Sequence, residues 1–201
     1  MGSNLITQNA DLILASSSKI RRHILADAGL AVEAVSPDFD EESAKQSLNL
    51  PVKDLALHLA KEKALSISKK KKDAYVIGSD QVCSLDEIEL SKSKDEDDAI
   101  NQLQKLNGKI HYQNNAVVVA FDGEIVFENL SIAKMTMRQM NLKNIEDYVA
   151  ADRPIGCAGS YKYESLGKHL FEKVEGDYYS VLGLAIQPLL SFFYQKNILK
   201  L

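Results

Sequence analysis

The chain has 201 residues, of which 45% are hydrophobic and 26% charged, and its formal net charge is −4. These values are ordinary for a globular protein with one sizeable core, and they exclude the overall basic character that binding of long nucleic acids needs. No apolar run is long enough to cross a membrane, and no basic stretch followed by an apolar core marks a secretory signal. We therefore expect a cytoplasmic protein.

The cysteines and histidines show no metal-binding pattern. Cys83 and Cys157 lie in apolar or small-residue surroundings without a paired spacing, which favours free thiols over a disulfide. The four histidines have no zinc-type spacing with one another or with cysteine. No repeat or linker is visible. We expect residues 1–201 to form a single domain, in which residues 1–10 are a loose N-terminal extension.

The first half of the chain predicts two strands, each followed by a helix. An apolar run predicts a strand at 11–15, and a helix from 18 to 28 follows a serine-rich turn. A second strand is expected at 31–35, before the acidic turn Pro37–Glu41. Apolar residues at helical spacing then predict a long helix from Val52 to Ser68.

The second half of the chain predicts a long hairpin between helices. The hairpin joins residues 111–121 to 124–138 through Asp122-Gly123, a pair typical of tight turns between strands. The other expected elements are a strand at 75–79 and helices at 95–106, 143–151 and 187–198. Helices that alternate with strands, together with one hairpin, predict an α/β fold with a mixed sheet.

The turn Ser16-Ser17-Ser18, followed by Lys19-Ile20-Arg21-Arg22, is suited to binding phosphate. Backbone N–H groups and the positive end of the helix dipole face such a turn. Serine hydroxyls add donors, and arginine adds a fork of charged ones. On these residues alone, an ordinary N-cap with solvated arginines is an equal alternative.

A second motif, Gly78-Ser79-Asp80-Gln81, places a carboxylate near the end of the strand expected at 75–79. Open α/β sheets bind ligands outside such strand ends, although an aspartate after Gly-Ser is also an ordinary turn residue. The two motifs resemble those of the Maf family of nucleotide pyrophosphatases. The resemblance covers nearly the whole chain in order, with further matches at Ala60–Ala64, Lys92, Leu106–Lys109, Cys157–Tyr161 and Val181–Leu184.

This resemblance implies an elongated, two-lobed architecture of the Maf/ITPase type, with a mixed twisted sheet flanked by helices and a central cleft. It also implies hydrolysis of a nucleoside triphosphate to the monophosphate and pyrophosphate, which would remove non-standard nucleotides. Asp80 would then act as the catalytic acid or base. Glu41 would bind a divalent cation, Mg²⁺ or Mn²⁺, because carboxylates are hard oxygen ligands. The expected phosphate contacts are Ser16, Ser18, Arg21, Lys63 and Lys92.

Within the family, the chain looks most like the branch that acts on 7-methyl-GTP. The positions that select the base fall on Ile20, Gln81 and Glu164. A 7-methylguanine base carries positive charge and presents N1–H and N2–H₂ donors, so an ionised Glu164 would accept both hydrogen bonds. The nearby aromatic residues Tyr161, Tyr163 and Phe171 either pack in the core or stack on the cationic base.

Three residues depart from the family pattern. Lys19 and Ser93 stand where the family usually has proline, and Ile20 stands where arginine or tyrosine is more usual. The missing proline at Ser93 predicts a looser backbone around Lys92. Two alternatives stay open: the same hydrolysis on dTTP or UTP, and a nucleotide-binding regulator of septum formation without turnover. A homodimer is compatible with the resemblance, but the sequence contains no direct evidence for one.

Overall fold

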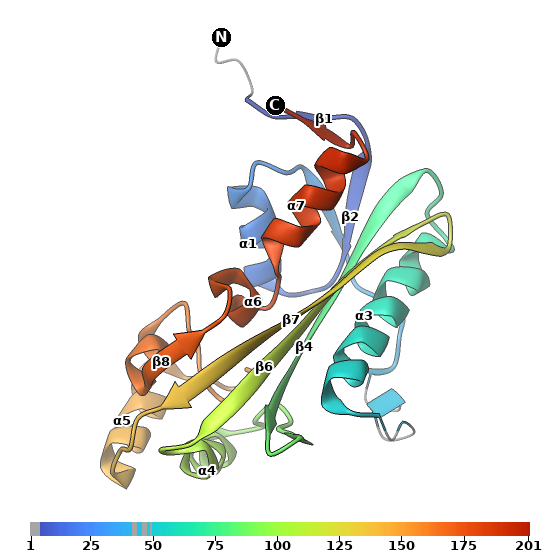
Figure 1. Ribbon diagram of the computed structural model, residues 1–201. Coiled ribbons are helices and arrows are strands. Elements are labelled where there is room, and N and C mark those ends of the chain that lie inside the picture. The colour runs from blue at the N-terminus through green and yellow to red at the C-terminus, as the bar shows by residue number, and fades with distance from the viewer. Residues whose placement is uncertain (1–4, 42–43, 46–47, 49) are drawn as a thin grey trace.

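The computed structural model describes residues 5–41, 44–45, 48 and 50–201. A mixed sheet with the strand order β3-β2-β4-β6-β7-β8, and with β5 beside β4, runs through the molecule (Figure 1). Its strands are β2 (Asp11–Ala15), β3 (Val32–Val35), β4 (Ala74–Leu85), β5 (Ile88–Glu89), β6 (Ile110–Phe121), β7 (Glu124–Met137) and β8 (Phe171–Glu175). β2 is parallel to β3 and β4, and the other pairs are antiparallel.

Helices cover both faces of this sheet (Figure 1). They are α1 (Lys19–Asp27), α3 (Val52–Ser68), α4 (Glu96–Leu106), α5 (Leu142–Asp152), the 3₁₀ helix η1 (Leu166–Leu170), α6 (Tyr178–Leu182) and α7 (Ile186–Gln195). α3 lies on one face, and α1 and α7 lie on the other. The sequence prediction of an α/β fold with a mixed sheet flanked by helices is therefore confirmed.

Two separate cores divide the elongated molecule into two lobes. In one, Leu25 of α1 and Phe193 of α7 pack on the sheet. In the other, residues of α4 and α5 pack against β7 and β8, with Leu103 and Ile145 among the fully buried side chains. A third cluster lies under α3, where its alanines contact the opposite face of β6. The long strands β4, β6 and β7 connect the lobes (Figure 1).

Most predicted elements are present. The helix expected at Val52–Ser68 has those bounds in α3, and the strand expected at 11–15 is β2. The predicted hairpin is β6 and β7, joined by a turn in which Asp122 and Gly123 both have positive φ. Positive φ at both central residues is the turn conformation that the pair Asp-Gly favours.

Three predictions need correction. β4 continues to Leu85 instead of ending at 79, because its pairing with β6 extends from Tyr75↔Phe121 to Ser84↔Tyr112. The last helix ends at Gln195 rather than 198, and the chain turns at Asn197, where φ is +56°, into β9 (Leu199–Lys200). Residues 1–10 are not all a loose extension, since Thr7–Gln8 forms β1 and pairs with β9; residues 1–4 lie outside the described part.

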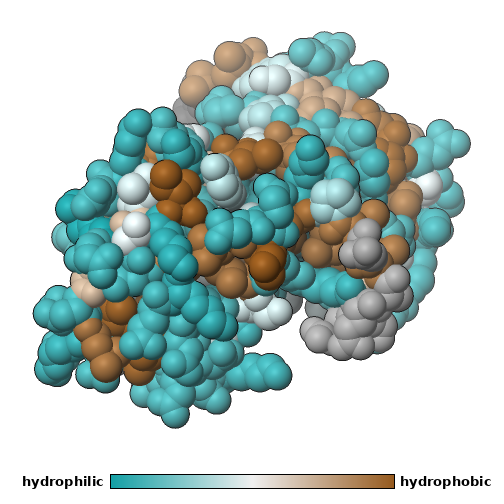
Figure 2. Space-filling model, turned by 60° about the horizontal axis from the view of Figure 1, so that its bottom comes forward, coloured by the Kyte–Doolittle hydropathy of each residue, from teal (hydrophilic) through white to brown (hydrophobic). Residues whose placement is uncertain are grey.

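The helices and the surface have the polarity that the ordinary hydrophobic and charged content of the chain predicts. None of the helices in the described residues is long and apolar enough to span a bilayer. Figure 2 shows one face of the molecule, on which hydrophilic side chains predominate and hydrophobic ones are gathered in separate patches. Both cysteines are free, as the sequence indicated; Cys83 is buried and Cys157 is half-buried.

Candidate active site

The site begins at a gap on one edge of β4. β2 pairs with β4 only from Asp11↔Ala74 to Leu14↔Ile77, and β5 joins β4 again at Ser84. Within the described residues, no strand pairs with this edge of β4 between Gly78 and Cys83. Asp80 and Gln81 point to opposite faces of a strand, yet both border the same cavity of about 210 Å³.

The cavity brings together residues that lie far apart in the sequence. Eight of the ten predicted site residues line it: Ser18, Ile20, Arg21, Lys63, Asp80, Gln81, Lys92 and Glu164. The other two, Ser16 and Glu41, lie directly behind the lining, because Ser16 contacts Arg21 and Glu41 contacts Lys63. The structure therefore assembles all ten residues in one place.

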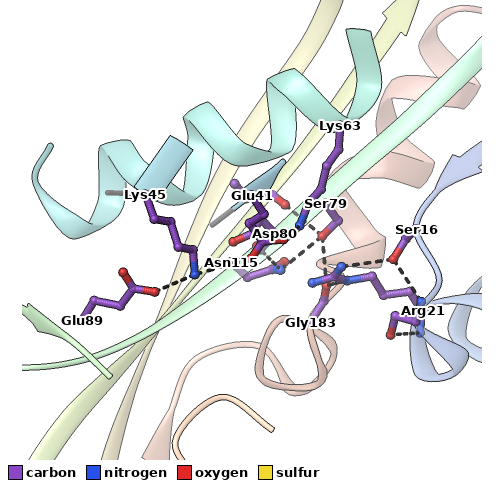
Figure 3. Close-up of polar contacts among 12 residues, drawn as sticks. Ser16, Arg21, Glu41, Lys45, Lys63, Ser79, Asp80, Glu89, Asn115 and Gly183 are labelled. Atoms are coloured by element: carbon purple, nitrogen blue, oxygen red, sulfur yellow. Dashed lines mark hydrogen bonds and ion pairs between the residues drawn. The ribbon is translucent and has the colours of Figure 1, made fainter. Parts of the chain in front are cut away.

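A buried ion pair forms the centre of the site. Lys63 comes from α3, and its Nζ lies 2.5 Å from Asp80 Oδ1 and 2.7 Å from Glu41 Oε2 (Figure 3). The exposed fraction is only 7% for Lys63 and 4% for Asp80. Asp80 Oδ2 is buried and has no hydrogen-bond partner in the described part of the chain. One oxygen of the buried carboxylate is thus neutralised, and the other is free to accept a proton or a cation.

A second lysine extends this network away from the cavity. Lys45 Nζ lies 3.4 Å from Glu41 Oε1 and 2.6 Å from Glu89 Oε1 on β5 (Figure 3). Burial raises the pKa of Glu41, but the charge and hydrogen bond of Lys63 and the charges of Lys92 and Lys45 outweigh it and lower that pKa to about 2. Glu41 is therefore an anion at neutral pH. Lys45 lies outside the sequence motifs that indicated the site.

The serine-rich turn holds Arg21 at the other side of the cavity. Ser18 is the N-cap of α1, since its Oγ accepts from Arg21 N at 3.5 Å. Arg21 Nη1 donates to Ser16 Oγ at 3.3 Å, and Nε donates to the carbonyl of Gly183 at 2.8 Å (Figure 3). Burial lowers the pKa of Arg21, although Asp80 and Glu41 counteract it. The N-cap alternative for this turn is correct, but Arg21 is oriented by the protein, whereas Arg22 is exposed.

Two buried side chains fix β4 against the start of α7. Ser79 Oγ lies 2.9 Å from the carbonyl oxygens of both Ala116 and Gly183. Asn115 Nδ2 donates to the carbonyl of Asp80 at 3.0 Å, and its Oδ1 accepts from Ala185 N at 2.9 Å. Gly183 adopts φ +106°, and in this conformation its carbonyl oxygen accepts hydrogen bonds from both Arg21 and Ser79. Asn115 lies outside the sequence motifs that indicated the site.

The far wall of the cavity comes from the second lobe. Cys157, Tyr161, Tyr163 and Glu164 line it. Phe171 is not part of the lining; it packs in the core, 4.8 Å from the ring of Tyr161 in an edge-on arrangement, so the stacking role considered for it is not available. Burial raises the pKa of the Cys157 thiol, and nearby Glu164 raises it further, so this cysteine is protonated at neutral pH and is not activated as a nucleophile.

Carboxylates are the candidate metal ligands beside the cavity. Among the described residues, no group of three or more histidine, cysteine or acidic side chains gathers to hold a metal ion. The acidic side chains at the centre of the described site are those of Glu41 and Asp80, and Asp80 Oδ2 has no partner there. Two carboxylates, completed by phosphate oxygens and water, are the set that Mg²⁺ accepts in enzymes of phosphoryl transfer.

Comparison with known proteins gives the family. The model for Maf-like protein matches residues 11–196. The chain belongs to the Maf-like family. A nucleoside triphosphate pyrophosphatase of Bradyrhizobium diazoefficiens is 43% identical over 192 residues, which cover 94% of this chain and 95% of that protein. A 7-methyl-GTP pyrophosphatase of Brucella abortus is 40% identical, with 90% and 93% covered, and one of Rhizobium johnstonii is 41% identical, with 89% and 92% covered.

The departures from the Maf pattern have clear positions in the structure. Lys19 is exposed at the start of α1, and Ile20 forms an apolar part of the cavity wall. Ser93 is buried, and its carbonyl accepts a hydrogen bond from Gly156 N at 3.0 Å. The backbone next to Lys92 is therefore hydrogen-bonded to the loop around Gly156, and the looser backbone expected from the missing proline stays a prediction.

Proposed function

We propose that this Maf-like protein is a nucleoside triphosphate pyrophosphatase that selects 7-methyl-GTP. The hydrolase class follows from the family and from the names of its relatives. The observation that carries the proposal is the convergence, in one cavity, of three cations, a buried carboxylate with a free oxygen, and Glu164 on the opposite wall. Such an enzyme would remove the methylated nucleotide from the cytoplasmic pool before polymerases use it.

The cations define the end of the cavity that takes the phosphates. Arg21, Lys63 and Lys92 come from three different segments and all line the cavity. A triphosphate spreads negative charge over many oxygens, and fixed cations stabilise the charge that develops on the leaving group. Because Arg21 is held by Ser16 and Gly183, its guanidinium needs little reorganisation when the substrate binds.

Asp80 is suited to activate water. Its Oδ1 is bound to Lys63, whereas Oδ2 has no partner among the described residues. Oδ2 is therefore the atom that would accept a proton from the attacking water. Water attacks the α-phosphorus, and its proton passes to Oδ2. The bond between the α-phosphorus and the bridging oxygen then breaks, and pyrophosphate leaves with the electron pair. The products are 7-methyl-GMP and pyrophosphate.

A divalent cation fits this arrangement. Glu41 and Asp80 Oδ1 would hold it together with phosphate oxygens once Lys63 has turned away from them, which leaves Asp80 Oδ2 for the proton of the attacking water; Glu41 is ionised at neutral pH. When bound, the cation would neutralise phosphate charge in the transition state. Lys63 lies between the two carboxylates, so its ammonium would turn toward the phosphates as substrate binds.

The opposite wall is suited to the base. Glu164 is exposed at the rim, where an ionised carboxylate complements the positive charge of 7-methylguanine and accepts from N1–H and N2–H₂. Gln81 Nε2 donates to the carbonyl of Val181 at 2.8 Å, which leaves its Oε1 as an acceptor. Tyr163 offers a ring for the cationic base, and Ile20 adds an apolar surface.

The test is hydrolysis of 7-methyl-GTP, GTP, dTTP, UTP and CTP with Mg²⁺ or Mn²⁺ in ¹⁸O-labelled water. We expect pyrophosphate, with little orthophosphate, mainly from 7-methyl-GTP, and ¹⁸O in the monophosphate. Asp80→Asn should abolish turnover, and Asp86→Asn in the exposed turn after the same strand should not. Preference for dTTP or UTP would reject the base assignment. Binding without turnover would reject the enzyme and favour a nucleotide-binding regulator.

Glu164→Gln tests the base assignment separately. Glutamine has one donor and one acceptor where the carboxylate has two acceptors, so it suits a pyrimidine better than guanine. We expect the preference for 7-methyl-GTP over dTTP to fall by at least about tenfold. Glu172→Gln, at an exposed position on β8, is the matched control. An unchanged preference in Glu164→Gln would contradict the role of this residue.

A further inference from the structure

A stripe of polar side chains lies inside β6. His111, Gln113 and Asn115 alternate along the strand and therefore share one face of the sheet. Each is almost fully buried, with exposed fractions of 0%, 2% and 0%. Further along the same face, the strand carries the core residues Val117 and Val119. A polar stripe in such a position requires hydrogen-bond partners, because burial removes the water that would otherwise supply them.

Neighbours satisfy these three side chains to different degrees. Asn115 uses both ends of its amide in the framework around Asp80. His111 Nε2 lies 3.0 Å from the hydroxyl of Tyr161, and burial lowers the pKa of His111 to about 4, so its ring is neutral. His111 Nδ1 and Gln113 Oε1 are both buried without a hydrogen-bond partner in the described part of the chain, but of these two residues only Gln113 lines the cavity.

The orientation of the Gln113 amide follows from its two partners. Nε2 lies 2.7 Å from Tyr161 Oη and 3.3 Å from the carbonyl oxygen of Ala158. A backbone carbonyl can only accept, so the nitrogen must face it, and the reversed amide would place two oxygens against each other. Oε1 is therefore the free end. It is buried and has no donor in the described part of the chain.

The residue that carries this free acceptor borders the cavity. Gln113 lines the cavity together with Glu164, Tyr161 and Tyr163, the residues of the wall that we assign to the base. A buried acceptor without a donor is unfavourable in the free protein, and a ligand that supplies the donor relieves that cost on binding.

We propose that Gln113 Oε1 is a further specificity-determining group, which accepts a hydrogen bond from the exocyclic 2-amino group of the guanine base. This inference rests on the proposed function. The amino group carries two hydrogens: one lies beside N1–H and pairs with Glu164, and the other is left for Gln113. A pyrimidine carries a carbonyl oxygen at its 2-position, which would oppose Oε1 and leave the acceptor unpaired.

The test compares 7-methyl-GTP with 7-methyl-ITP, which differs only by the missing 2-amino group. In the wild type, we expect kcat/KM to favour 7-methyl-GTP by about tenfold or more. In Gln113→Leu, the ratio should fall by about fivefold or more but stay above one, since Glu164 still accepts from the amino group of 7-methyl-GTP. Both nucleotides are measured on one preparation, so the ratio is independent of how much of the variant folds. The dissociation constants of the two monophosphates provide a readout separate from turnover.

Two further variants separate hydrogen bonding from packing. Gln113→Met keeps a side chain of similar length but has no oxygen for the amino group, so the preference should fall as it does in Gln113→Leu. Gln104→Leu, at an exposed position on α4, should leave the preference unchanged. Hydrolysis of both methylated purines with the same ratio in the wild type and Gln113→Leu would overturn this role alone. If the wild type hydrolyses neither nucleotide, the proposed function is overturned, and this role with it.

Discussion

The carbonyl oxygen of Ala60 in α3 lies 2.2 Å from the position that a Cβ on Gly78 of β4 would occupy. The backbone nitrogen of Ala64 would be 2.9 Å from the same atom. Helix and strand therefore meet backbone to backbone, at a distance that only glycine permits. Lys63 lies on the helix between these two alanines, and Asp80 follows two residues after Gly78, so this approach brings the ion pair together.

Gly78→Ala should separate α3 from β4, because no flexible side chain is available to move aside. We expect a loss of about 1–3 kcal/mol of unfolding free energy, which is typical of overpacking. Hydrolysis should fall more strongly than the folded fraction does, since Lys63 moves with the helix. Chemical denaturation and kcat of the folded variant measure the two effects. A variant with the stability and activity of the wild type would show that the close approach is unnecessary.

Lys63 and Lys61 form a natural pair for comparison. They lie two residues apart on α3, but Lys61 makes a surface ion pair with Glu128, whereas Lys63 is buried between Asp80 and Glu41. Lys63→Met should lower kcat about a hundredfold or more, because it removes a fixed charge from the phosphate end of the site. Lys61→Met should change activity within about twofold, as expected for an exposed pair. Equal effects in steady-state assays would contradict the assigned position of the phosphates.

Glu41 should contribute a pH-dependent part of the stability. Its pKa is lowered from 4.5 to about 2 in the folded protein, so its contribution is complete above pH 4.5 and is lost as the pH falls toward 2. Near neutral pH, the free energy of unfolding of the wild type should exceed that of Glu41→Gln by at most about 3 kcal/mol. Urea unfolding at several pH values measures the difference. The difference should shrink below pH 4.5, and one that is constant with pH would refute the ion-pair explanation.

His111 should make the stability depend on pH in a higher range than Glu41 does, because its pKa is shifted by burial and not by an ion pair. Burial lowers its pKa from 6.5 to about 4, so the unfolded chain binds a proton in this interval and the folded protein does not. Stability therefore decreases as the pH falls from 6.5 to 4. His111→Phe should remove this part of the slope, whatever its effect on absolute stability. Thermal unfolding followed across this interval measures the slope, and a slope unchanged in His111→Phe would contradict the assignment to His111.

Elements whose signals are local were predicted well. The helix at Val52–Ser68 repeats apolar residues at helical spacing, and the turn at Asp122-Gly123 requires the positive φ that these residues adopt readily. β8, α6 and η1 were missed because each has only five residues, which is too short for a periodic pattern.

The site was predicted as a set of residues but not as a geometry. Family motifs identified Asp80, Lys63 and Glu164, but only the fold places them around one cavity. Gln113 stands within the continuous polar run His111–Asn115, so the sequence does not distinguish it from its neighbours. Nothing in the sequence marks Lys45 or the carbonyl of Gly183, because their roles depend entirely on which groups lie beside them.

The sequence by itself determined the fold class, the positions of most helices and strands, and the chemical groups available for hydrolysis, since periodicity, turn residues and side-chain chemistry are local properties. The tertiary structure decided the length of β4, the gap where β2 stops, and the burial that leaves Asp80 Oδ2 and Gln113 Oε1 without partners among the described residues. Strand pairing and desolvation arise from contacts between residues far apart in the chain, so no local pattern encodes them.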